Sequence, residues 1–196
     1  MALSLVRDLI RLYDGVLPPT LCKRIVALFE SAPEHHIGPR GRPLGQRDSE
    51  RHFNWVQMNT SDRPGFAEID EEIARAVNQH VERYVADTGY GLFPYGFEEF
   101  LIKRYLPSLH DQFPPHVDIS SRNSMHRMLA VLLYLNDVAG GGETEFVKLG
   151  LKVQPRQGRL LMFPPTWMYP HAGLPPQGGP KYILGTYLIY VDPRRT

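Results

Sequence analysis

Apolar residues recur along the first half of the chain at the spacing of amphipathic helices. Between residues 64 and 87 they return every three or four positions, which predicts a long helix with one buried face. Residues 18–29 show the same spacing behind two prolines, which favour a helix start. Looser alternation over residues 9–13 and 53–58 predicts two short strands beside these helices.

The pattern changes at about residue 98. Short apolar or alternating segments follow one another there, separated by Gly and Pro turns, which predicts a sandwich or a small barrel. The expected strands cover residues 100–106, 113–118, 128–135, 143–147, 151–154, 159–163 and 181–191. The predicted fold class is therefore mainly β with supporting helices, and we expect the N-terminal helices to pack on one sheet.

We expect one domain over residues 1–196, because this length and a hydrophobic content of 42% suit a single sizeable core. Residues 1–97 would form its helical and strand support, and residues 98–193 its β core. The stretch 38–52 is rich in Gly, Pro and Arg, and it predicts a long exposed loop. Loops of this length are commonly disordered or functional, so a lid over a site is one of two interpretations.

Charge gives no sign of a nucleic-acid or membrane-surface partner, because 22 Lys and Arg residues balance 21 Asp and Glu residues. The single Cys22 cannot form an internal disulfide, and its helical context predicts a buried thiol and a reducing compartment. Arg7 and Asp8 interrupt the first apolar stretch, and the longest apolar run, residues 128–135, is too short to span a membrane. We therefore expect a soluble, cytoplasmic protein.

The triplet His116-Val117-Asp118 carries the first sign of chemistry. Residues i and i+2 of a strand project from one face, so the imidazole and the carboxylate can converge on one point. A second histidine from a neighbouring strand would complete a 2-His-1-carboxylate set, which holds Fe(II) and leaves positions open for substrate and oxygen. His171 is the candidate for that histidine.

An ordered series of motifs places this triplet in a wider pattern. The series is His116-x-Asp118, Tyr134-Leu135-Asn136, Gly141-Gly142-Glu143-Thr144-x-Phe146, Pro155-x-x-Gly158, His171 and Lys181. Over residues 100–191 it resembles the Fe(II)/2-oxoglutarate dioxygenases of the prolyl 4-hydroxylase type. The resemblance implies a distorted double-stranded β-helix, or jelly roll, that carries the metal at its open mouth.

The resemblance also implies a role for each motif residue. His116, Asp118 and His171 would be the catalytic metal ligands, with Fe(II) as the ion. Lys181 would pair with the far carboxylate of the cosubstrate 2-oxoglutarate, which explains a lysine at the start of an apolar strand, where an unpaired ammonium would be costly. The alternative for Lys181 is a lysine that faces solvent.

Three further residues match family positions in the pocket. Tyr134 would hydrogen-bond the same carboxylate as Lys181, and Tyr105 would reach the chelating end of 2-oxoglutarate. Either tyrosine could instead be a core aromatic. Arg127 would face the substrate and bind a carboxylate if the substrate has one. Its alternative is an edge-strand arginine in solvent.

The implied reaction hydroxylates an unactivated C–H bond with O2, while 2-oxoglutarate is converted to succinate and CO2. The presence of Asp118 favours hydroxylation over halogenation, since related halogenases lack this carboxylate. The implied substrate is a prolyl residue of a peptide or a small amino-acid-like molecule, and ascorbate is a candidate reductant. The arginine-rich loop suggests an anionic substrate, and the oligomeric state stays open.

Three other interpretations are compatible with parts of the pattern. A nucleic-acid demethylase of the same superfamily would normally have an arginine pair in place of Lys181 and a basic face. A cupin-like metal protein or enzyme could use His116, Asp118 and His171 without 2-oxoglutarate, which leaves Lys181 unexplained. A non-enzymatic binding module is a third possibility, since fold does not fix function, but it would be expected to have a broken ligand set.

Overall fold

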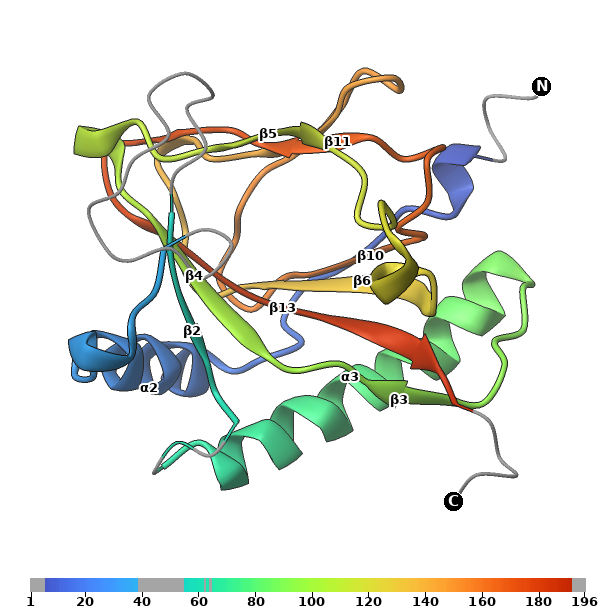
Figure 1. Ribbon diagram of the computed structural model, residues 1–196, viewed down its shortest axis with the longest axis horizontal. Helices are drawn as coiled ribbons and strands as arrows, with labels where there is room; N and C mark the ends of the chain where they lie inside the picture. Colours follow the sequence, from blue (N-terminus) through green and yellow to red (C-terminus); the bar gives the residue numbers. More distant parts are fainter. Residues whose placement is uncertain (1–5, 39–54, 62, 64, 192–196) are drawn as a thin grey trace.

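The protein is built in three layers, seen here in a computed structural model that describes residues 6–38, 55–61, 63 and 65–191. Helices α2 (Pro19–Glu30) and α3 (Ala67–Thr88) cover one face of a large central sheet, and a small sheet lies over the other face (Figure 1). The two-sheet fold with helices packed on one sheet, predicted from the sequence, is confirmed. No helix in the described residues has the length and apolar content needed to cross a membrane.

Both main sheets are antiparallel. The large sheet runs, in spatial order, through β1 (Arg11–Tyr13), β10 (Leu160–Phe163), β6 (Arg127–Tyr134), β13 (Lys181–Tyr190), β4 (Leu101–Tyr105) and β2 (Val56–Asn59), and β3 (Tyr95–Phe97) also pairs with β13. The small sheet contains β5 (Phe113–His116), β11 (His171–Gly173), β8 (Thr144–Phe146) and β9 (Leu151–Val153). A separate pair joins β12 (Pro176–Gln177) to β7 (Gly140–Gly141). Short 3-10 turns lie at Pro33–His35, Pro107–Leu109 and Arg122–Ser124.

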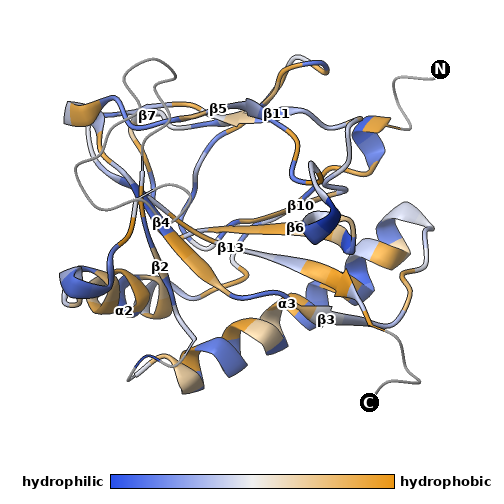
Figure 2. Cartoon of the chain, in the orientation of Figure 1, coloured by the Kyte–Doolittle hydropathy of each residue, from blue (hydrophilic) through white to orange (hydrophobic). Residues whose placement is uncertain are grey.

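The large sheet is buried on both faces, and this explains the unbroken apolar run in its central strand β6. Leu129, Val131 and Leu133 pack with the residues of the two helices, whereas Ala130 and Tyr134 belong to a second cluster between the sheets. Strands covered on both sides need apolar residues at every position. Figure 2 shows this hydrophobic character along β4, β6 and β10, and the two-sided colouring of the amphipathic helices.

The sequence located most elements but missed some short strands. The apolar stripe of α3 is buried as expected, through Ile69, Ile73, Val77, Val81 and Tyr84. Strands β3, β7, β11 and β12 were not predicted, because segments of two or three residues are too short to show a period. Apart from Gly38, the predicted loop at residues 38–52 lies outside the described residues.

A tight contact at Gly158 joins the N-terminal segment to the β core. Gly158 has a φ of +76°, donates to the Tyr134 carbonyl (2.9 Å) and accepts a hydrogen bond from the Val16 amide (2.8 Å). A side chain there would collide with the Leu17 carbonyl oxygen. We therefore expect Gly158→Ala to lower the free energy of unfolding by about 2 to 4 kcal/mol.

The matched control is Gly15→Ala, since Gly15 has a similar φ of +70° but nothing within 4 Å of an added β-carbon. Gly15→Ala should lower the free energy of unfolding by only about 1 kcal/mol, which is the cost of placing a side chain on the left-handed backbone. Urea unfolding of both variants measures the difference. Equal losses would show that the contact with Leu17 is not tight.

Candidate metal centre and its pocket

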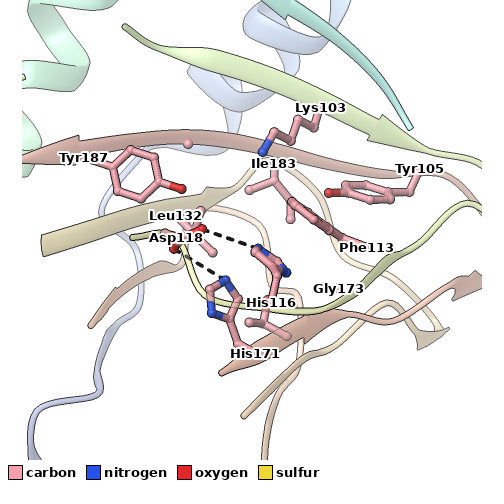
Figure 3. A pocket seen from close by; sticks show the side chains of 12 residues that line it. Lys103, Tyr105, Phe113, His116, Asp118, Leu132, His171, Gly173, Ile183 and Tyr187 are labelled. Atoms are coloured by element: carbon pink, nitrogen blue, oxygen red, sulfur yellow. Dashed lines mark ion pairs between the residues drawn. The ribbon is translucent and has the colours of Figure 1, made fainter. Parts of the chain in front are cut away.

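Two histidines and an aspartate converge between the sheets. His116 and His171 are direct register partners on β5 and β11, and Asp118 follows two residues after His116. Their candidate ligand atoms all lie within 4.8 Å of one another. An Asp118 carboxylate oxygen lies 3.4 Å from Nε2 of His116, and the other lies 3.6 Å from Nε2 of His171 (Figure 3). Asp118 does not lie in the predicted strand over residues 113–118: β5 ends at His116, so Asp118 lies in the bend beyond it.

Both imidazoles present Nε2 to the centre of this cluster. Nδ1 of His116 lies 2.9 Å from the Pro114 carbonyl oxygen, and Nδ1 of His171 lies 3.1 Å from that of Tyr169. A carbonyl oxygen can only accept, so each Nδ1 must carry the hydrogen. Each Nε2 then keeps its lone pair, which is the arrangement that orients a metal-binding histidine.

The charge states of the cluster also suit a metal ion. Burial lowers the pKa of His171 to about 4, so its imidazole is neutral at pH 7. Burial acts to raise the pKa of Asp118, but the nearby histidines and a hydrogen bond from Tyr187 outweigh it and lower the pKa to about 2. An ionised carboxylate and a neutral imidazole are the forms that bind metals.

The spacing fits a bound divalent ion. Ligands on bonds of about 2.1 Å at right angles would have their donor atoms about 3 Å apart, close to the separations seen here. The set of two imidazoles and one carboxylate, on one side of a pocket, is the donor set of non-haem Fe(II) oxygenases. The residues therefore fit the ion that the sequence implied.

Two side chains of the large sheet, from β6 and β13, form hydrogen bonds with Asp118. The Tyr187 hydroxyl hydrogen-bonds its carboxylate, and the Arg127 guanidinium donates to its backbone carbonyl (3.0 Å). The same guanidinium pairs with both oxygens of Glu98, at 2.8 to 3.1 Å, and lies 3.8 Å from the Tyr187 ring centroid. Arg127, expected to face the substrate, is thus engaged within the protein, where it positions Asp118.

Lys181 is fully buried at the start of β13. Its ammonium donates to the carbonyl oxygens of Gly142 (2.9 Å) and Leu174 (3.4 Å), and it lies 4.3 Å from the centroid of the Tyr105 ring. It also lies 3.7 Å from the place that a β-carbon on Gly173 would take. Burial lowers the pKa of Lys181 to about 7. No carboxylate in the described part of the chain forms an ion pair with it.

The two candidate tyrosines lie at the Lys181 end of the pocket. Tyr105 lines the pocket and faces Lys181 across the β4–β13 pair. Tyr134 lies just behind the wall, where its hydroxyl donates to the Thr144 hydroxyl (2.7 Å), and Thr144 lines the pocket. The structure thus brings Lys181, Tyr105 and Tyr134 together at one end and the three metal-ligand candidates at the other.

Several residues of the pocket wall were not predicted from the sequence. Lys103 and Tyr187 project into it from β4 and β13, and Phe113 stacks on the His116 ring with centroids 3.5 Å apart. The strand period could have found the first two, since Lys103 is two residues from Tyr105 and Tyr187 is six from Lys181. Phe113 gave no signal beyond that of a core aromatic.

Comparison with known proteins gives concordant results. The family model described as the 2OG-Fe(II) oxygenase superfamily matches residues 100–189. A protein of Acanthamoeba polyphaga mimivirus that is described as a prolyl 4-hydroxylase is 32% identical over 192 residues, which cover 89% of this chain and 71% of the relative.

Solved structures of prolyl hydroxylases share the fold. A prolyl-4-hydroxylase from Pseudomonas putida superposes with a TM-score of 0.68 at 22% identity, covering 98% of this chain and 100% of the other. The viral collagen prolyl hydroxylase of Paramecium bursaria Chlorella virus-1, in its 2-oxoglutarate complex, gives a TM-score of 0.67 at 21% sequence identity. The superposition covers 94% of this chain and 97% of the viral chain. The prolyl hydroxylase of Trichoplax adhaerens, bound to a hypoxia-inducible-factor peptide, gives a TM-score of 0.67 at 16% sequence identity. The superposition covers 96% of this chain and 87% of the other chain.

These structures confirm the double-stranded β-helix, while the family model matches the stretch that contains the histidines, the aspartate and the buried lysine. The chain belongs to the 2OG-Fe(II) oxygenase superfamily.

Proposed function

We propose that this protein is an Fe(II)- and 2-oxoglutarate-dependent hydroxylase that acts on a prolyl residue of a peptide or on an amino-acid-like molecule. One observation carries the proposal: a complete 2-His-1-carboxylate cluster lines a pocket, and a fully buried lysine that pairs with no described carboxylate lies directly beside that pocket, against Tyr105 and Gly173. A dicarboxylate bound between them would place one carboxylate at the metal and pair the other with the lysine ammonium. A cupin-like site without 2-oxoglutarate gives no reason for the buried ammonium of Lys181.

The residues divide the work along the pocket. His116, Asp118 and His171 would hold the iron, and Arg127 and Tyr187 would fix the carboxylate among the ligands. Lys181 would bind the far carboxylate of 2-oxoglutarate, with Thr144 and Tyr134 beside it. Iron held here would supply oxidation by O2, in which C–H becomes C–OH and 2-oxoglutarate becomes succinate and CO2.

The substrate proposal rests on the relatives. The mimivirus protein is described as a prolyl 4-hydroxylase, and the three solved structures are prolyl hydroxylases, one of them with a bound peptide. The pocket is lined mostly by apolar and aromatic groups around the ligand cluster, which suits the hydrocarbon ring of proline.

The test is turnover with Fe(II), 2-oxoglutarate and air. We expect an unstructured proline-rich peptide, or free L-proline in a parallel reaction, to gain one oxygen atom by mass spectrometry while an equal amount of succinate forms. Omitting 2-oxoglutarate should stop both. If the protein binds iron and 2-oxoglutarate but oxidises no proline-containing compound, the prolyl substrate is wrong. If it binds iron but not 2-oxoglutarate, the hydroxylase proposal itself is wrong.

A further inference from the structure

A second lysine, Lys103, points into the pocket from the large sheet. It lies on β4, two residues before Tyr105, so both side chains project from the same face. Figure 3 shows its ammonium directed into the space across from His116 and His171. Lys103 is therefore part of the pocket wall and not of the outer surface of the sheet.

The charge of Lys103 is compensated only in part, because burial outweighs the favourable effect of the Asp118 carboxylate and lowers the pKa of the lysine. Its ammonium lies 5.4 Å from the Trp55 ring centroid and 5.5 Å from that of Phe113. Among residues 6–38, 55–61, 63 and 65–191, no hydrogen-bond acceptor or carboxylate pairs with it, whereas its neighbour Arg104 pairs with Glu30 at 2.7 Å. Aromatic faces offset only part of the cost of removing an ammonium from water. An anionic ligand would supply the missing partner.

The strand register places Lys103 between the two ends of the pocket. On β13, Ile183 and Tyr187 line the pocket, and Lys181 lies on the same face of the strand at its start. Tyr187 hydrogen-bonds Asp118. Lys103 faces Ile183, two residues from Lys181 and about 7 Å further along the strand toward the metal ligands. Burial is the main reason that the pKa values of His171 and Lys181 are lowered, and the Lys103 charge adds to both shifts. Lys103 is therefore within electrostatic reach of both ends.

A chelating 2-oxoacid leaves one acceptor free at the metal end. It binds a metal through its keto oxygen and one carboxylate oxygen, so the second oxygen of that carboxylate stays available. We propose that Lys103 binds this carboxylate, so that two lysines of the pocket hold the two carboxylates of 2-oxoglutarate, Lys181 at the far end and Lys103 at the metal end. The inference rests on the proposed function, because it requires 2-oxoglutarate to bind in this pocket.

A ligand series separates the two lysines. The probes are 2-oxoglutarate and 2-oxopentanoate, which keeps the keto acid and the five carbons but lacks the far carboxylate. Isothermal titration calorimetry under nitrogen, with Fe(II) bound, gives Kd for each. We expect Lys103→Met to weaken both ligands by the same factor, about tenfold to a hundredfold, as for loss of a charge-assisted hydrogen bond. Lys181→Met should weaken 2-oxoglutarate alone.

Further variants control for folding and charge. Lys103→Arg keeps the cation and should recover much of the affinity for both ligands. Lys148→Met removes an exposed lysine outside the pocket and should bind as the unaltered protein does. Urea unfolding and iron content verify that each variant folds and carries metal.

The outcomes distinguish the two proposals. If Lys103→Met binds both ligands normally while Lys181→Met loses 2-oxoglutarate, Lys103 does not bind the cosubstrate and this inference is wrong. If Lys103→Met weakens 2-oxoglutarate alone, Lys103 serves the far carboxylate, which also overturns it. If the unaltered protein binds no 2-oxoglutarate, the proposed function fails first.

Discussion

His171→Ala should lose both iron binding and hydroxylation. Changing residues that only support metal ligands already costs roughly ten- to a hundredfold in affinity, so losing a ligand should cost more than about a hundredfold. The imidazole of His171 is already neutral at pH 7, because burial lowers its pKa to about 4, and its Nε2 is free to bind. Removing it leaves one histidine and one carboxylate, too few to hold Fe(II) against water.

Iron content after desalting, and the weak visible band that Fe(II) and 2-oxoglutarate form without oxygen, measure this loss. Asp118→Ala should behave in the same way, because Asp118 faces both histidines. His35→Ala, which changes a histidine of a 3-10 turn outside the cluster, should keep the iron, the band and the activity. An iron content in His171→Ala equal to that of the unaltered protein would remove His171 from the metal site.

Lys181→Met should bind 2-oxoglutarate about a hundredfold more weakly while it keeps its iron. The far carboxylate would then lie in a buried pocket without its cation, and losing one partner of such a pair costs about 2 to 5 kcal/mol. Gly173→Ala gives an independent test, because its methyl group would lie 3.7 Å from the ammonium and obstruct the approach of a carboxylate. Titration calorimetry under nitrogen measures both. Undiminished affinity in Lys181→Met would place the far carboxylate elsewhere.

The same lysine should make cosubstrate binding depend on pH. Burial holds the pKa of Lys181 at about 7 in the free protein, so above pH 7 most molecules carry a neutral amine. A bound carboxylate favours the charged form and raises this pKa, so binding takes up a proton there. Affinity should fall by up to about tenfold for each pH unit above 7. Calorimetry at pH 8 in two buffers of different ionisation enthalpy measures the proton, and Lys181→Met should show no uptake.

Sequence and structure agree where a residue pattern has one physical explanation. A 2-His-1-carboxylate set requires its two histidines to lie side by side, which predicts that their strands pair. The register of β5 with β11 confirms this, because it places His116 directly opposite His171. Lys103 escaped notice because a lysine in an alternating strand normally indicates the solvent side. Its spacing of two residues from Tyr105 did indicate the inward direction, because residues i and i+2 of a strand project from the same face.

Contacts between distant segments could not be predicted in this way. Arg127 matched a substrate-facing position, but its role depends on Glu98, which lies 29 residues earlier and pairs with it across the sheet. Nothing in the local sequence of either residue indicates that pairing. Likewise, Asp118 lies beyond the end of β5, where Arg127 and Tyr187 hydrogen-bond it, and the strand period does not predict these contacts.

Binding of 2-oxoglutarate should indicate whether β13 has paired in its native register. This strand pairs with β4 and β6 at once, and in the observed pairing Lys181 faces inward opposite Tyr105. A slip of one residue would turn Lys181 toward the helices and bring Tyr182 into its place. Misregistered chains would then have no cation for the far carboxylate. Immobilised 2-oxoglutarate would therefore retain natively paired molecules and let such misfolded ones pass.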